Sequence, residues 1–125
     1  MFLGLDLGTT NIKALVVNES GKIIGQGAVP VTLRHVADGG VEQDIEEIWR
    51  ATLSAIRKAG QAVDLRAVKA VGVSSQGGAI QFRAPDGQPI GPVISWFDSR
   101  GQRYDTELTG RLGENWFSSH TGHGA

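Results

Sequence analysis

Two short apolar segments at the start of the chain restrict the fold more than any other feature of the sequence. Residues 2–7 and 12–17 are mostly apolar, and the small polar run Gly8-Thr9-Thr10-Asn11 separates them. Apolar runs of this length bounded by turn residues are typical of buried strands, so they predict a hairpin with a glycine at its bend. A second turn at residues 18–21 leads into residues 22–29, which predict a third antiparallel strand. The chain is therefore expected to open with a three-stranded meander.

A helix and a fourth strand are expected next. Six residues fall at helical spacing on one face: Ile45, Ile48, Trp49, Thr52, Leu53 and Ile56. Asp44 is placed to cap the start of this helix, with Glu47 in capping-box register, and Gly60 is placed to end it. Residues 68–74 then predict a strand that follows a helix and so lies parallel to one of the first three. The sheet is therefore expected to be mixed.

The remaining residues give weaker patterns. Residues 79–83 and 90–94 flank the turn Pro85-Asp86-Gly87, which predicts another hairpin, and residues 99–112 are helix-like but weakly periodic. A length of 125 residues suits one domain or a piece of one.

Composition excludes several classes of protein. Charges nearly cancel, with 12 Lys and Arg against 13 Asp and Glu spread along the chain, so nothing indicates a nucleic-acid partner. The absence of cysteine excludes a disulfide scaffold and a thiol nucleophile. No signal peptide is evident, and no stretch approaches the ~20 apolar residues of a membrane span. His120 and His123 have a spacing that some metal sites use, but no third ligand is evident nearby. We expect a cytoplasmic protein without a membrane partner.

The candidate chemistry lies at the bend of the first hairpin. Common phosphate motifs, G-x-x-x-x-G-K-[ST] and G-x-G-x-x-G, are absent. Asp6 stands near the end of an apolar strand. Burying an acid there costs free energy unless the carboxylate has a functional role or pairs with another group. A glycine turn with two hydroxyls and several N–H groups follows Asp6. Such a turn can bind an anion, and a carboxylate beside it can bind Mg²⁺ directly or through water, as phosphoryl transfer requires. An Asx-turn in an ordinary hairpin is the alternative interpretation.

The segment from Gly4 to Lys13 resembles the first phosphate loop of the actin-like ATPase superfamily, which includes sugar kinases, chaperones and actins. Four further features resemble the FGGY family of carbohydrate kinases. They are the hairpin at Gly21, the run Gly40–Asp44 before the helix with Trp49, the run Ser74–Gly78, and Trp96-Phe97-Asp98-Ser99-Arg100. The resemblance runs from about residue 2 to the end and covers the opening part of a family chain several times longer.

The resemblance implies an α/β fold in which residues 1–74 are the β-β-β-α-β start of a ribonuclease-H-like (actin-like ATPase) domain, incomplete at the C-terminus. Residues 1–125 would then be a partial N-terminal domain of an FGGY carbohydrate kinase. No catalytic residue is expected in this chain, because the family's catalytic base would lie beyond Ala125. The missing C-terminal kinase domain is therefore an expected partner, and we expect these 125 residues to be inactive alone.

The same resemblance implies ATP and Mg²⁺ as cofactors. Asp6 would organise the metal and phosphate, and Gly8, Thr9 and Thr10 would line the phosphates. Lys13 would add positive charge, although a solvated strand lysine is an equal alternative.

The sugar side is also assigned by resemblance. Gln76, Gly77 and Gly78 would line the sugar cleft, where xylulose kinases commonly show Gln-Met-His-Gly and glycerol kinases an Arg-Glu pair. The two glycines depart from both patterns. Trp96 would supply a flat apolar wall to a sugar ring, with core packing as the alternative.

Two charged residues complete the expected sugar site. Asp98 would accept hydrogen bonds from hydroxyls, and Arg100 would contact the sugar or, as we favour, pair with Asp98 and hold it in place. The Trp-x-Asp-x-Arg pattern is closer to the xylulose kinases than to the glycerol kinases.

We therefore expect the N-terminal part of an ATP-dependent carbohydrate kinase that phosphorylates a hydroxyl of a small ketose or polyol, with a xylulose-like sugar favoured. One alternative is an actin-like or chaperone-like ATPase fragment, and another is a non-catalytic remnant of a sugar kinase. The Trp96-x-Asp98-x-Arg100 pattern discriminates between kinase and chaperone, because a chaperone has no use for a sugar wall.

Overall fold

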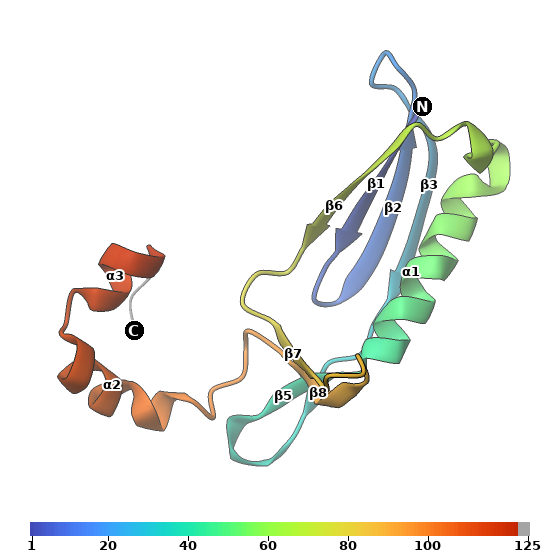
Figure 1. Cartoon of the computed structure of the whole chain (residues 1–125). Coiled ribbons are helices and arrows are strands. Elements are labelled where there is room, and N and C mark those ends of the chain that lie inside the picture. The colour runs from blue at the N-terminus through green and yellow to red at the C-terminus, as the bar shows by residue number, and fades with distance from the viewer. Residues whose placement is uncertain (123–125) are drawn as a thin grey trace.

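The computed structural model describes residues 1–122, and its main body is a four-stranded sheet with a helix on one face (Figure 1). Strands β1 (Phe2–Leu7), β2 (Asn11–Val17) and β3 (Ile23–Pro30) form an antiparallel meander. Strand β6 (Ala70–Ser75) joins β1 in parallel register, which gives the order β3-β2-β1-β6. The predicted meander and the predicted mixed sheet are both confirmed.

Helix α1 (Ile45–Ala59) lies between the meander and β6 in the chain and packs against β2 and β3. Asp44 caps it as predicted, because its carboxylate accepts hydrogen bonds from the N–H groups of Glu46 and Glu47 at 2.8 and 3.3 Å. The expected capping-box role of Glu47 is wrong. Its carboxylate instead accepts from the N–H and hydroxyl of Thr32, at 2.9 and 2.8 Å, and so ties the end of the meander to the helix.

Two glycines of β3 allow the strand and the helix to approach closely. A Cβ atom at Gly25 would lie 2.1 Å from the carbonyl oxygen of Ala59, and one at Gly27 would lie 2.3 Å from that of Ala55. Both distances are far inside van der Waals contact. The facing alanines are almost completely buried. The core beneath the sheet therefore depends on small residues at this crossing.

A second four-stranded sheet follows the order β4-β5-β8-β7 and lies at one end of the first (Figure 1). Its members are β4 (Arg34–His35), β5 (Val41–Gln43), β7 (Ile80–Arg83) and β8 (Pro89–Ile94), all paired antiparallel. The hairpin predicted around residues 85–87 is confirmed as β7 and β8. Strands β4 and β5 were not predicted, because runs of two and three residues are too short to show a period.

Helices α2 (Asp105–Leu112) and α3 (Trp116–Thr121) extend away from both sheets (Figure 1). The helix-like pattern from residue 99 therefore becomes an α-helix only from residue 105. Short 3-10 turns occur at Ala37–Gly39, Gly60–Ala62, Leu65–Ala67 and Gln102–Tyr104. Within residues 1–122, none of the helices combines the length and the apolarity that a bilayer crossing requires.

Replacing Gly27 by alanine is expected to lower the free energy of unfolding by about 1–3 kcal/mol, because the added methyl group forces α1 away from β3. Gly72→Ala is the matched control, since a Cβ at position 72 meets no atom within 4 Å. Its effect should stay within about 0.5 kcal/mol. Urea denaturation followed by circular dichroism measures both. Equal stability of the two variants would contradict the close packing of strand and helix.

Candidate functional site

The bend between β1 and β2 is a tight turn that requires glycine at position 8. The N–H of Gly8 donates to the carbonyl oxygen of Asn11 over 3.2 Å, and a Cβ at Gly8 would lie 2.7 Å from that oxygen. Within residues 1–122, the N–H groups of Thr9 and Thr10 donate to no protein acceptor. The turn therefore presents two free N–H groups beside two hydroxyls, which is an arrangement that can bind an anion.

Asp6 and Lys13 lie opposite each other in the β1–β2 register, on the face of the sheet away from α1. The Lys13 Nζ is 3.6 Å from Asp6 Oδ2, and both side chains are more than half exposed. An exposed pair of this kind contributes little to stability, so it holds neither partner firmly. The carboxylate is accessible to a hydrated cation, and the ammonium group is free to turn toward a phosphate.

Three segments that are distant in sequence meet at Thr9. The Gln43 amide donates from Nε2 to the carbonyl oxygen of Thr9 at 2.9 Å. Gln76 donates from its Nε2 to Gln43 Oε1 at 2.8 Å. The Trp96 indole N–H donates to Thr9 Oγ1 at 3.1 Å. The structure therefore brings the expected phosphate turn into contact with Trp96 directly and with Gln76 through Gln43.

The carbonyl of Thr9 fixes the direction of this hydrogen-bond chain. A carbonyl only accepts, so Gln43 must turn its NH₂ group toward Thr9 and its oxygen toward Gln76. Gln76 must then offer its own NH₂ group to Gln43. Its Oε1 is left as a buried oxygen without a partner among residues 1–122. Gln43 is 1% exposed and was missed as a site residue, since its position before a helix was the only signal in the sequence.

Trp96 forms an exposed wall. Trp96 is 53% exposed and its ring stacks on Phe97, with ring centroids 3.7 Å apart, so it is not part of the core that residues 1–122 form. Gly78 has a φ of +74° and lies directly beside it, because a Cβ at this position would be 3.2 Å from the Trp96 Cβ. A Cβ at Gly77 would meet open space. Gly78 therefore leaves room next to the indole that a larger side chain would fill.

Asp98 is engaged within the protein. Its carboxylate accepts from the Val41 N–H at 2.9 Å and from the Arg100 guanidinium at distances down to 2.6 Å, and its side chain is 6% exposed. Arg100 also pairs with Glu42 at 2.9 Å. The hydrogen bond from Arg100, and then that from Val41, holds the pKa of Asp98 far below its usual range. The geometry thus gives Arg100 the pairing that we favoured, and it joins the Trp96–Arg100 loop to β5.

A cavity of about 590 Å³ is lined by several of the residues that were expected to bind the substrate. Gly78, Trp96, Asp98 and Arg100 all line it, and its floor is apolar, with Ile80 among the contributing side chains. Gln76 and Gly77 do not line this cavity. Gln76 instead lines a smaller one of about 170 Å³ that also contains Gly8, between the phosphate turn and the start of α1.

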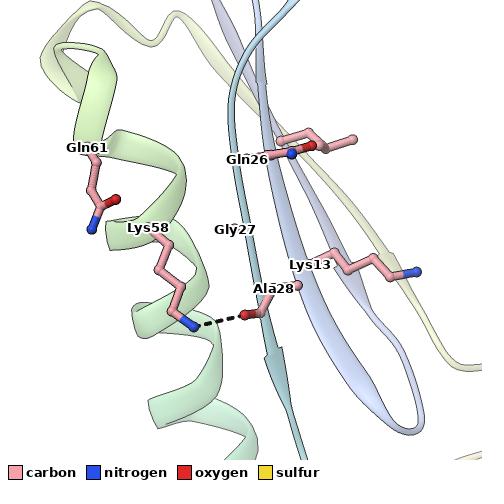
Figure 2. A pocket seen from close by; sticks show the side chains of 7 residues that line it. Lys13, Gln26, Gly27, Ala28, Lys58 and Gln61 are labelled. Carbon is pink, nitrogen blue, oxygen red and sulfur yellow. Dashed lines mark hydrogen bonds between the residues drawn. The ribbon is translucent and has the colours of Figure 1, made fainter.

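A different cavity, of about 550 Å³, follows the outer edge of β3 (Figure 2). It is lined by Lys13, Leu15, Gln26, Gly27, Ala28, Lys58 and Gln61. Lys58 reaches from α1 and donates to the carbonyl oxygen of Ala28 at 3.1 Å (Figure 2). The cavity shares only Lys13 with the expected site, and the Lys13 ammonium group pairs with Asp6. We therefore place the candidate site at Thr9 and not at this edge.

The histidine pair at residues 120 and 123 lies partly outside the described residues, because these end at residue 122. His120 stacks on Trp116, and its Nδ1 lies 2.8 Å from the carbonyl oxygen of Trp116. Within residues 1–122, no three side chains of His, Asp, Glu or Cys form a metal-binding group. Phosphate oxygens and water are common further ligands of a Mg²⁺ ion that is bound by a carboxylate such as Asp6.

A mixed sheet that opens with an antiparallel meander, with an exposed carboxylate beside a turn of free N–H groups, defines an α/β domain of the ribonuclease-H-like class. Within this class the chain belongs to the FGGY family of carbohydrate kinases, since residues 1–125 match the family model of its N-terminal domain.

Individual relatives agree with this assignment. The chain is 32% identical over 123 residues to an apulose kinase of Pectobacterium atrosepticum, covering 98% of this chain and 25% of that protein. It is 33% identical over 100 residues to a xylulose kinase of Klebsiella pneumoniae, covering 80% of this chain and 21% of that protein. Glycerol kinases match as well. The structure of a gluconate kinase from Lactobacillus acidophilus has the same fold, with a TM-score of 0.88 at 23% identity over 98% of this chain and 25% of that one. The chain spans about a quarter of the length of the curated relatives that it matches.

The substitution Asp98→Asn is expected to lower the free energy of unfolding at neutral pH. In acid this loss of stability should become smaller. The folded-state pKa of Asp98 lies below the ordinary value of 3.8, so its contribution is present above that value and is lost as the pH falls below it. The difference in unfolding free energy between wild type and variant should therefore shrink between pH 7 and pH 2.5.

Urea denaturation at several pH values measures this difference. Asp86→Asn is the control, since this residue lies in the β7–β8 turn, where it accepts from the Gln88 N–H and pairs with no guanidinium group of residues 1–122. Its effect should stay small throughout. A pH-independent effect of Asp98→Asn would contradict the role of the ionised carboxylate.

Proposed function

We propose that this chain supplies the phosphate-binding turn and part of the sugar pocket of an ATP-dependent carbohydrate kinase. The enzyme would transfer the γ-phosphoryl group of ATP to a hydroxyl of a ketose or polyol. Membership of the family supports the general reaction. The observation that carries the finer proposal is the meeting of the β1–β2 turn with Trp96 at Thr9, because phosphoryl transfer needs the donor phosphate beside the acceptor hydroxyl.

The residues of the turn fit a metal-bound phosphate. Asp6 offers an accessible carboxylate, Thr9 and Thr10 offer free N–H groups, and the absent side chain at Gly8 leaves the bend compact. Mg²⁺, when bound with ATP, would neutralise charge on the phosphates. In this proposal Asp6 holds the metal directly or through water, the two threonines donate to phosphate oxygens, and Lys13 adds positive charge.

The cavity at Trp96 fits a small polyhydroxylated substrate. The exposed indole offers an apolar face to a sugar ring, and Gly78 leaves space beside it. Arg100 acts by holding Asp98, so a sugar hydroxyl bound by Asp98 would share a carboxylate that already accepts from Val41. Gln76 lies outside this cavity and reaches the phosphate turn through Gln43.

We favour a xylulose-like ketose, because the Trp-x-Asp-x-Arg pattern resembles the xylulose kinases and a xylulose kinase is among the relatives. The catalytic base is assigned to the C-terminal kinase domain beyond Ala125, since Asp6 faces the metal and Asp98 is engaged. A cytoplasmic location agrees with a chain that has no cysteine.

The substitution Asp6→Asn is expected to lower kcat by at least about 100-fold while changing the dissociation constant of the sugar by less than about threefold. The reason is that Asp6 faces metal and phosphate, and loss of such a charge removes several kcal/mol of transition-state stabilisation. The measurement is sugar-dependent release of ADP, over a panel of ketoses and polyols, by the natural polypeptide that contains residues 1–125. Asp86→Asn serves as the control for the same chemical change in an exposed turn.

Turnover of Asp6→Asn within about threefold of wild type would contradict the metal assignment, because a lost transition-state charge costs far more than that. If the wild-type protein binds sugar and nucleotide but releases no ADP, the non-catalytic alternative would be correct. If it hydrolyses ATP with no response to any sugar, the ATPase alternative would be correct.

A further inference from the structure

We propose that the hydrogen bond from Trp96 to Thr9 couples the sugar pocket to the phosphate turn, so that each substrate strengthens the binding of the other. Trp96 and Gln43 act here as positioning residues for Thr9. The inference rests on the proposed function and extends it, because it assigns a physical connection between the two substrate sites.

Thr9 is held at two points of different rigidity. Its carbonyl is bonded to Gln43, which is 1% exposed and is itself held by Gln76. Because the Gln43 amide is buried, this bond is shielded from water on its donor side, and this end of Thr9 is the more firmly held. Its hydroxyl is bonded to Trp96, which is 53% exposed and can change its orientation. The hydroxyl end is therefore the adjustable one.

The indole N–H determines the direction in which the Thr9 hydroxyl donates. A hydroxyl has one proton and two acceptor positions, and an indole N–H is only a donor. When Trp96 donates to Thr9 Oγ1, the hydroxyl proton must point away from the indole. It is then available to an anion at the β1–β2 turn, where the N–H groups of Thr9 and Thr10 are also free. Accepting one hydrogen bond also makes the hydroxyl a stronger donor.

A sugar ring that stacks on Trp96 would restrict the indole and exclude water from its N–H bond. Thr9 would then stay oriented as a donor, and a phosphate would bind more tightly. The reverse effect follows by linkage, because the coupling between two binding equilibria is equal in both directions. One neutral hydrogen bond corresponds to a roughly three- to tenfold change in affinity.

The experiment is a calorimetric titration of the natural polypeptide that contains residues 1–125 with AMPPNP and Mg²⁺, in the absence and presence of a saturating sugar. The sugar is D-xylulose or, if the wild type does not bind it, the ketose or polyol of the panel that the wild type does bind. We expect the sugar to tighten nucleotide binding by roughly three- to tenfold in the wild type. In Trp96→Phe, which keeps an aromatic wall and removes the N–H, this factor should fall to about one. Trp49→Phe is the matched control, because Trp49 is 56% exposed on α1, away from the site, and the sugar should still tighten binding as in wild type.

A second pair of variants tests the acceptor. Thr9→Val keeps the shape of the side chain but removes the hydroxyl, so it should also abolish the coupling. Thr9→Ser keeps the hydroxyl and should retain it. The double variant with Thr9→Val and Trp96→Phe should lose no more coupling than either single variant, since both remove the same hydrogen bond.

The outcomes separate the inference from the proposed function. Failure of the wild-type protein to bind the nucleotide, or to bind any ketose or polyol of the panel, would overturn both. If the wild type binds both ligands independently, or if Trp96→Phe retains the coupling, the inference is wrong and the proposed function stands. Loss of coupling in Trp49→Phe as well would also overturn the inference, because it would show a general effect of removing an indole.

Discussion

The buried hydrogen bond between Gln43 and the carbonyl of Thr9 is the interaction on which the arrangement of this molecule depends. Gln43 belongs to β5 of the second sheet and Thr9 to the turn between β1 and β2 of the first, so the bond ties the two sheets together at this turn. A buried amide is costly when its donor is unpaired, and the Thr9 carbonyl is the acceptor that the Gln43 NH₂ group uses. The ion pairs of Arg100 with Asp98 and Glu42 then hold the Trp96 loop to the same short strand. The position of the indole beside the phosphate turn follows from these contacts.

The sequence predicts the parts of the fold that depend on regular patterns. Residues 2–7 and 12–17 are apolar runs separated by a glycine turn, and α1 has both a periodic face and a capping aspartate, so each of these elements could be predicted. The contacts that join segments distant in sequence could not be predicted. Glu47 is in register for a capping box, but Thr32 is a neighbour only in three dimensions and takes its carboxylate instead. Strand β5 forms because it pairs with β8, and β4 forms because it pairs with β5, while both are too short for their sequences to show a period.

The candidate site shows the same division. Asp6, Gly8 and the two threonines could be predicted because an acid and a glycine turn at the end of a buried strand are unusual locally. The role of Gln43 could not, since it depends on where the turn and Gln76 lie in space. For Trp96 the sequence left two interpretations, a wall of the sugar site and a core residue, and its exposure and its bond to Thr9 in the structure favour the first. The substrate assignments of Gln76, Asp98 and the other residues stay predictions.

The two edge strands of the first sheet, β3 and β6, differ in whether a further strand could pair with them. At β3, Lys58 donates to a carbonyl that an incoming strand would otherwise use, and α1 packs directly against the strand backbone. At β6, no such lysine covers the edge among the described residues, and Val71 and Val73 are more than half exposed. A row of unpaired backbone groups beside exposed valines is a template for a further strand. The sheet is thus closed to extension on one side and open on the other, so any added strand would extend it from β6.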